Sequence, residues 1–304
     1  MKKLLVVTVS LFLVVMVSAQ QSQFLLYSMK GNVTVVENKV ESKAKIGNML
    51  SPTATIKVPA GGSVTFVCNE AAMFSFVKAG TYPLSNFGDS CKPKSTSSVS
   101  SNYIKYVWAS MTKSSSNPGS NRKAYMNTVG AVTRGDPMNN VWIDPRLDTV
   151  NYSGINGTFP LSWKSYADAE EFEFSLYTAD NVTTPFYSSF VKKLKVPITD
   201  FFSKIKPGNI YYWTAAVKGE TNETLKPFIY VTKETYAAVL ANIKQMKVPG
   251  EAPAEEAYRT GFMLEDAHYL AEAYEYYSKA AQLDTTNVLY RSTLMSFKKD
   301  YEIK

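Results

Sequence analysis

The stretch LEDAHYLAEAYEYYSKAAQLDTTN, from Leu264 to Asn287, decides how the C-terminal part of this chain folds. Ala273, Tyr277 and Ala280 recur at intervals of four and three residues, which places them on one face of a helix. Gly261 lies one helix earlier, at the distance that a helix-turn-helix pair requires. Small side chains let a neighbouring helix approach, and the tyrosine fills the remaining gap, so the spacing predicts a helical hairpin with an apolar seam.

The hairpin resembles a tetratricopeptide repeat, whose small and bulky positions are matched in order by Ala257, Gly261, Leu264, Ala273, Tyr277 and Ala280. Thr285 stands where that family usually has a proline, and Thr260 replaces a large apolar residue. Only one full repeat is visible, followed by a half-repeat helix. Because such units are stable only when stacked on others, another domain of the chain or a partner should cover the seam.

The resemblance implies a partner-binding face on the first helix of the hairpin, formed by Glu255, Tyr258, Phe262, Glu265 and Asp266. That face is acidic and aromatic, so it implies a basic partner segment, and a solvated helix face is the alternative. His268 is the only histidine and falls at the turn between the two helices. No Ser or Cys motif offers it a nucleophile, so we expect a surface or turn residue.

The N-terminus has the layout of a secretory signal: two lysines, an apolar run from Leu4 to Val17, and the small pair Ser18 and Ala19. Residues 1–19 are therefore a predicted signal peptide. A transmembrane anchor is the alternative, but the run is shorter than the roughly 20 residues that a bilayer needs. We expect an exported protein, periplasmic or associated with the outer membrane or cell surface, with no membrane span after cleavage.

Residues 20–91 predict a small β domain, because apolar residues alternate in ATIKV and SVTFV on either side of the turn PAGGS. Ile56 and Val58 share one face, and Val64 and Phe66 share another. These glycine-punctuated strands resemble the FecR-like β domain of bacterial envelope proteins. Cys68 and Cys91 are the only cysteines, and an oxidising compartment allows them to pair. Two independent buried thiols are the alternative.

Residues 92–140 predict a Ser-rich linker around an amphipathic helix in SNYIKYVWASM that clips the first domain to the next. Residues 20–140 carry 13 Lys and Arg against 5 Asp and Glu, so an anionic polymer is a candidate ligand. The candidate polymer-binding residues are Lys105, Lys113, Arg122, Lys123 and Arg134. An exported protein is not expected to bind nucleic acid, and a solvated basic face is the alternative.

Residues 141–246 predict a β-sandwich with a trailing helix, because short strands are separated by turn residues at regular intervals. LSW and KPGNIYYWTAAV resemble strands of a fibronectin type III or immunoglobulin-like sandwich, with Tyr211 as its tyrosine corner. Trp163 and Trp213 lie on faces that fill a core. Residues 247–254 predict a linker, and residues 255–304 the repeat-like helices. The expected fold class is mainly β with a helical C-terminus.

No catalytic motif is present in the sequence: it has no phosphate-binding glycine loop, no HExxH and no nucleophile elbow. Glu171 and Glu173 alternate with Phe172 and Phe174, so the carboxylates should face water and the rings the core. We therefore predict no enzyme activity and no cofactor or metal. The expected function is a non-catalytic envelope scaffold that docks another envelope protein through its C-terminal helices. The alternative is a module that binds cell-wall glycan or another anionic envelope polymer through the basic N-terminal half.

Overall fold

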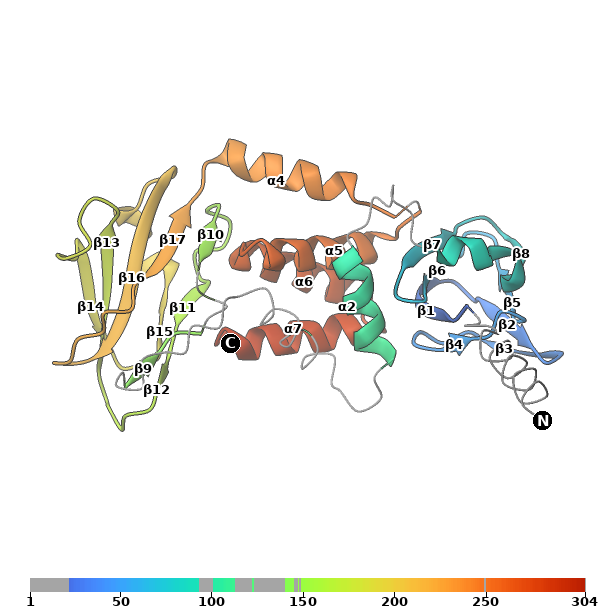
Figure 1. Cartoon of the computed structure of the whole chain (residues 1–304), viewed down its shortest axis with the longest axis horizontal. Helices are drawn as coiled ribbons and strands as arrows, with labels where there is room; N and C mark the ends of the chain where they lie inside the picture. Colours follow the sequence, from blue (N-terminus) through green and yellow to red (C-terminus); the bar gives the residue numbers. More distant parts are fainter. Residues whose placement is uncertain are drawn as a thin grey trace, which may run out of the picture. The chain divides into compact units, whose positions relative to one another are not determined.

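The computed structural model of the chain describes residues 22–92, 101–112, 122, 140–144, 147, 149–248 and 250–303. The chain divides into two compact units, a first unit of Met1–Lys94 and a second unit of Ser95–Lys304. Figure 1 shows both units. The predicted signal peptide, residues 1–19, lies outside the described residues. Within the described ranges no helix is long and apolar enough to cross a membrane.

The first unit is built from two four-stranded sheets, ordered β4-β1-β6-β7 and β3-β2-β5-β8. Its strands are β1 Phe24–Lys30, β2 Thr34–Glu37, β3 Val40–Lys43, β4 Met49–Leu50, β5 Thr55–Val58, β6 Ser63–Cys68, β7 Ala72–Phe76 and β8 Gly80–Pro83, followed by the 3-10 helix η1, Leu84–Cys91. One core joins Val64 and Phe66 of one sheet to Ile56 and Val58 of the other. Ile56 and Val58 are buried on one face of β5, as predicted, and Val64 and Phe66 reach the same core, but burial does not alternate along β6, where Thr65 and Val67 are buried too.

The turn between β5 and β6 uses two glycines for two different reasons. Gly61 has a φ of 72°, a left-handed conformation that glycine adopts without steric cost. Gly62 has no such φ. A Cβ atom at Gly62 would lie 2.9 Å from Pro59 and 3.0 Å from the Lys30 carbonyl oxygen, so this position requires glycine for space.

The β part of the second unit contains a five-stranded sheet, ordered β10-β17-β16-β13-β14, and two two-stranded sheets, β11-β15 and β12-β9. The strands are β9 Val141–Trp142, β10 Val150–Tyr152, β11 Pro160–Ser162, β12 Lys164–Ser165, β13 Phe172–Thr178, β14 Tyr187–Val191, β15 Lys195–Pro197, β16 Asn209–Val217 and β17 Lys226–Tyr230. The rings of Trp163 and Trp213 lie 6.2 Å and 5.9 Å from that of Phe174. Both tryptophans are buried, as predicted.

In the described part of the second unit the α-helices are α2 Ser101–Thr112, α4 Lys233–Gln245, α5 Pro253–Asp266, α6 Leu270–Leu283 and α7 Val288–Asp300, and two short 3-10 helices are η3 Ile198–Asp200 and η4 Phe202–Lys204. The turn between α5 and α6 is made at His268, whose φ is 61°, so the predicted turn position is confirmed. A Cβ atom added at Gly261 of α5 would lie 2.9 Å from Cδ1 of Tyr277. Tyr277 is fully buried together with Ala273 and Ala280, which confirms the predicted seam.

The seam is covered by other parts of the same unit. Phe262 of α5 contacts Tyr103 and Tyr106 of α2, with ring centroids 5.4 Å and 4.7 Å apart. On the sandwich side, Phe159 lies 6.4 Å from Phe297 of α7. Figure 1 shows α2 lying against the C-terminal helices. Helix α2 therefore packs within the second unit.

Candidate functional site

The predicted partner-binding face of α5 is buried inside the second unit. Glu255, Tyr258, Phe262 and Glu265 are all at most 3% exposed, and Asp266 is half-buried. Their neighbours are aromatic side chains of α2, α6 and α7. The prediction that these residues bind a partner is therefore wrong. A helix face that is apolar and acidic in sequence can be covered by another segment of the same chain, and here α2 covers it.

A hydrogen-bonded chain of hydroxyl groups crosses this buried region. The Tyr258 hydroxyl lies 2.9 Å from the Thr293 hydroxyl and donates to the Tyr106 hydroxyl at 3.2 Å. Burial raises the pKa of Tyr258 well above its ordinary value. Its hydroxyl therefore stays neutral and fixes the mutual orientation of α2, α5 and α7.

Arg122 is fully buried and ion-paired, which removes it from the predicted polymer-binding surface. Its terminal nitrogens donate to the carboxylates of Glu265 and Asp300, and its guanidinium lies 5.3 Å from the ring centroid of Phe297. The prediction that Arg122 meets an anionic polymer is therefore wrong, because its charge is already neutralised within the fold.

The other residues of the predicted polymer-binding set are only partly covered by the structure. Lys105 lies on α2 and is exposed. Lys113, Lys123 and Arg134 lie outside the described residues. The structure does not bring the members of this set together within its described ranges.

A second buried arginine ties the segment between α4 and α5 to the helices. Arg259 donates from Nε and Nη2 to the two carboxylate oxygens of Glu251, at 2.7 Å and 2.8 Å, and from Nη1 to the Ile243 carbonyl oxygen at 2.9 Å. Burial raises the pKa of Glu251, and the Arg259 guanidinium opposes that effect. Residues 247–254, predicted as a linker, therefore include a buried anchor.

A third buried charge lies where α6 meets the sandwich. Glu272 is fully buried, and one of its oxygens accepts a hydrogen bond from the Ser153 backbone N–H at 2.6 Å. The other oxygen has no hydrogen-bond partner within the described part of the chain, and the same holds for the hydroxyls of Tyr152 and Tyr236. Burial raises the pKa of Glu272. Because an unpartnered buried carboxylate is costly, this junction is less stable when Glu272 is charged.

Glu272→Gln is expected to make the second unit more stable at pH 8 by about 1 kcal/mol, or roughly 2–4 °C in Tm. The folded-state pKa of Glu272 lies above its unfolded-state value, so wild-type stability falls as the pH rises from the ordinary carboxyl pKa to the raised one. The glutamine variant lacks this fall. All four tryptophans, Trp108, Trp142, Trp163 and Trp213, belong to the second unit, so their fluorescence measures its melting at pH 5 and pH 8.

The control for this measurement is Glu275→Gln, which changes an exposed carboxylate on the same helix. We expect this variant to melt like the wild type at both pH values. An identical pH dependence in the wild type and Glu272→Gln would show that Glu272 is not the titrating group.

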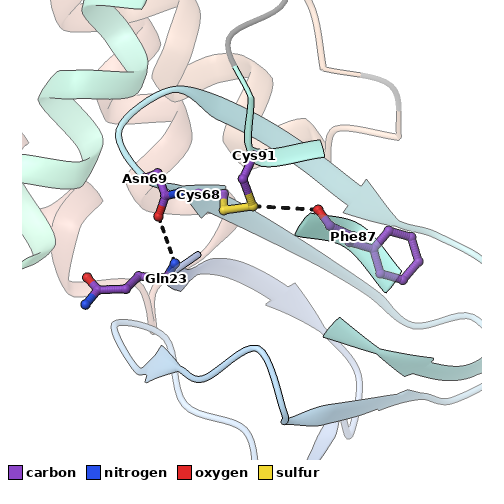
Figure 2. The surroundings of a disulfide bond; sticks show 5 residues. All are labelled: Gln23, Cys68, Asn69, Phe87 and Cys91. Atoms are coloured by element: carbon purple, nitrogen blue, oxygen red, sulfur yellow. Dashed lines mark hydrogen bonds between the residues drawn. A yellow bond between two sulfur atoms is a disulfide. The ribbon is translucent and has the colours of Figure 1, made fainter. Parts of the chain in front are cut away.

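The two cysteines of the first unit form a disulfide (Figure 2). Cys68 ends β6, and Cys91 ends the helix η1, so the bond ties the helix to the sheet. Beside it, Asn69 accepts a hydrogen bond from the Gln23 backbone N–H at 2.8 Å (Figure 2). Closing a loop with a sequence separation of 23 residues stabilises a fold by about 3 kcal/mol in the chain-entropy model.

One face of α7 carries exposed apolar and basic side chains together. Val288 and Met295 are 62% and 71% exposed, and Arg291 and Lys299 are exposed on the same face. These four residues, at positions i, i+3, i+7 and i+11 of the helix, form what we call the α7 face. Sequence reasoning missed it, although the repeated spacing of apolar and basic residues was a readable signal.

No three or more His, Cys, Asp or Glu side chains are placed to hold a metal ion in the part of the chain that the structure describes. Glu171 and Glu173 are half-buried, whereas Phe172 and Phe174 are in the core, as the strand alternation predicts. No family model matches the chain, and no curated protein matches it in sequence.

Proposed function

We propose that the protein is a non-catalytic, exported interaction protein of the bacterial cell envelope, and that its C-terminal helices dock another envelope protein. The α7 face carries this proposal, because it combines two highly exposed apolar side chains with two cations. Stacked helical repeats normally end in a polar outer face that keeps the terminal helix soluble. Val288 and Met295 depart from that rule, so the α7 face suits a further helix supplied by a partner.

Charge complementarity indicates the chemistry of the partner. Arg291 and Lys299 flank Met295 on the α7 face, and Lys298 lies beside them at the end of the helix. An amphipathic helix with a few apolar residues and acidic flanks would satisfy both the apolar and the basic part of this face. The partner is therefore proposed to be acidic, which replaces the basic partner expected for the buried α5 face.

Three structural resemblances support an envelope interaction protein. In the sandwich, the Tyr211 hydroxyl accepts a hydrogen bond from the Lys206 backbone N–H at 2.8 Å, the contact typical of a tyrosine corner in fibronectin type III or immunoglobulin-like sandwiches. The close approach of α5 and α6 at Gly261 and Tyr277 agrees with the proposed tetratricopeptide-like hairpin, in which small residues let the two helices pack closely. The first unit, with its short strands, is proposed to be FecR-like.

Export is supported by the disulfide between Cys68 and Cys91. Disulfides form and persist in oxidising compartments such as the bacterial periplasm. The expected signal peptide and this bond therefore agree with a periplasmic or surface-associated protein.

Met295→Asp is expected to weaken docking of the partner at least tenfold. The substitution places a charge in the centre of the α7 face, where an apolar contact would be desolvated on binding. Because Met295 is 71% exposed, the stability of the second unit should change by less than about 0.5 kcal/mol. The measurement is affinity capture of partners from solubilised envelopes, followed by quantification of each captured protein.

The matched control is Val40→Asp on β3 of the first unit, where the side chain is 67% exposed. This variant should capture the same proteins as the wild type. Equal capture by Met295→Asp would contradict docking through the α7 face. If retention in the envelope instead depended only on salt, the alternative function, binding of an anionic polymer by the basic N-terminal half, would be favoured.

A further inference from the structure

Three buried polar atoms at the junction between the sandwich and the helical hairpin have no hydrogen-bond partner within the described part of the chain. They are Oε2 of Glu272 on α6, the hydroxyl of Tyr152 on β10 and the hydroxyl of Tyr236 on α4. Buried polar groups without partners are rare in folded proteins, because each one loses its hydration without replacement. Three elements therefore meet here at a point that is costly to keep closed.

The tyrosines of this junction lie within electrostatic reach of the Glu272 carboxylate. Burial raises the pKa of Tyr152 and of Tyr236, and the negative charge of Glu272 raises both further. The same two effects act on the pKa of Tyr269. The tyrosines that face the junction come from β10, β17, α4 and α6 with its N-cap: Tyr152, Tyr230, Tyr236, Tyr269 and Tyr276. A tyrosine hydroxyl is neutral at physiological pH, so none of these groups balances the charge of Glu272.

The turn between α5 and α6 adds two further titratable groups. Asp266 and His268 are half-buried, and Oδ1 of Asp266 and Nδ1 of His268 make no hydrogen bond within the described residues. Burial raises the pKa of Asp266, and His268 opposes that effect. Burial also raises the pKa of Glu272, but there the opposing effect comes from hydrogen bonds with Ser153. His268 therefore acts on Asp266, while the Glu272 carboxyl depends on its contact with the end of β10.

Helix α4, which runs between β17 and α5 (Figure 1), is the least buried of the elements around Glu272. Of its 13 residues only Ile243 is buried. Its last turn is held by Arg259, whose Nη1 donates to the Ile243 carbonyl oxygen at 2.9 Å. Its first turn is held by the ring of Tyr236, which lies 5.5 Å from that of Tyr269. The first turn of α4 is therefore the part of this junction that opens at the lowest cost.

Opening of this first turn gives the Glu272 carboxyl access to water. A charged carboxylate gains more from hydration than a neutral one, so its ionisation favours the open arrangement. The folded-state pKa of Glu272 is raised. The closed arrangement is therefore fully favoured below the ordinary carboxyl pKa and loses stability as the pH rises through the raised one.

We propose that α4 is a pH-sensitive strap, closed over Glu272 when this carboxyl is neutral and opened at its first turn when the carboxylate is charged. The hinge of the strap is its last turn, where Arg259 holds the Ile243 carbonyl oxygen. Because α4 connects β17 to α5, the pH then controls how firmly the hairpin is joined to the sandwich. The strap involves α4, α6 and β10, so it does not depend on docking through the α7 face.

Hydrogen exchange of the full chain, followed by mass spectrometry at pH 5 and pH 8, tests the strap. After correction for the intrinsic exchange rate, the protection of the first half of α4 should fall by roughly threefold or more between pH 5 and pH 8. At both pH values α4 should exchange at least about tenfold faster than the central strand β16, because α4 opens locally. Glu272→Gln cannot ionise, so its α4 should be equally protected at both pH values.

His268→Asn is the matched control, because His268 also titrates near neutral pH and asparagine tolerates its φ of 61°. This variant should show the same change in α4 as the wild type. Loss of the pH effect in His268→Asn would overturn the proposal, since His268 would then be the titrating group. It would also be overturned by equal protection of wild-type α4 at both pH values or by an undiminished fall in Glu272→Gln. Equal protection of α4 and β16 would overturn it too, because α4 would then open only when the whole unit unfolds.

Discussion

Arg259→Ala is expected to lower the free energy of unfolding of the second unit by about 3–5 kcal/mol. Removing the guanidinium leaves the carboxylate of Glu251 and the carbonyl oxygen of Ile243 without the donors that now reach them at 2.7–2.9 Å. Arg259 itself is fully buried, so water does not readily replace it. Urea unfolding followed by tryptophan fluorescence measures this loss in the second unit alone.

The loss of unfolding free energy caused by Arg259→Ala should become smaller at low pH. Burial raises the pKa of Glu251, and removal of Arg259 takes away the charge that opposes this effect. The unpaired carboxylate is costly only when ionised, so the difference between wild type and variant should shrink as the pH falls below the raised pKa. Arg291→Ala, at an exposed position of α7, is the control and should cost less than about 0.5 kcal/mol. If Arg259→Ala and Arg291→Ala lowered the free energy of unfolding by similar amounts, the pairing of Arg259 with Glu251 would not be an important stabilising contact.

Gly261→Val is expected to destabilise the second unit by about 2–4 kcal/mol, since overpacking typically costs 1–3 kcal/mol and valine adds a branched side chain. Even a Cβ atom at this position would lie 2.9 Å from Cδ1 and 3.1 Å from Cε1 of Tyr277. The ring has little freedom to move away, because it is fully buried and its hydroxyl donates to Glu265 at 2.9 Å. Thermal and urea unfolding by tryptophan fluorescence measure the effect.

A double-mutant cycle assigns this cost to the contact between α5 and α6. Tyr277→Leu gives the valine room, so the double variant should be more stable than the sum of the two single effects predicts, by about 1 kcal/mol or more. Ala238→Val, at an exposed position of α4, tests the intrinsic cost of valine in a helix and should lose well under 1 kcal/mol. If the losses of stability of Gly261→Val and Tyr277→Leu were strictly additive, the clash between the new valine side chain and the Tyr277 ring would not be the cause of the cost.

Much of the local structure was predictable because it depends on neighbouring residues. The alternation around Phe172 and Phe174 identified a strand with its rings in the core, and the spacing of Ala273, Tyr277 and Ala280 identified a buried helix face. The coarse order, β elements first and helices last, also follows from these periodicities.

The candidate sites were harder to predict, because they depend on contacts between residues far apart in the chain. Arg122 looked like one of several surface cations, yet its partners Glu265 and Asp300 lie in α5 and α7, more than 140 residues further along the chain. Nothing in the local sequence distinguishes a solvated arginine from one that neutralises two buried carboxylates. The pairing of Arg259 with Glu251 is closer in sequence, and an arginine in the apolar run AYRTGFML is a signal that could have been read.

The amino-acid sequence by itself determined which side chains must leave water: the tryptophans of the sandwich and the alanine and tyrosine seam of the hairpin. Only the tertiary structure decided what covers them, since Tyr258 and Phe262 meet α2 of their own chain rather than a partner. The physical reason is that hydrophobic burial is non-directional. A periodic apolar face specifies that it must be covered but not by which surface, and that choice depends on contacts between distant segments that periodicity does not encode.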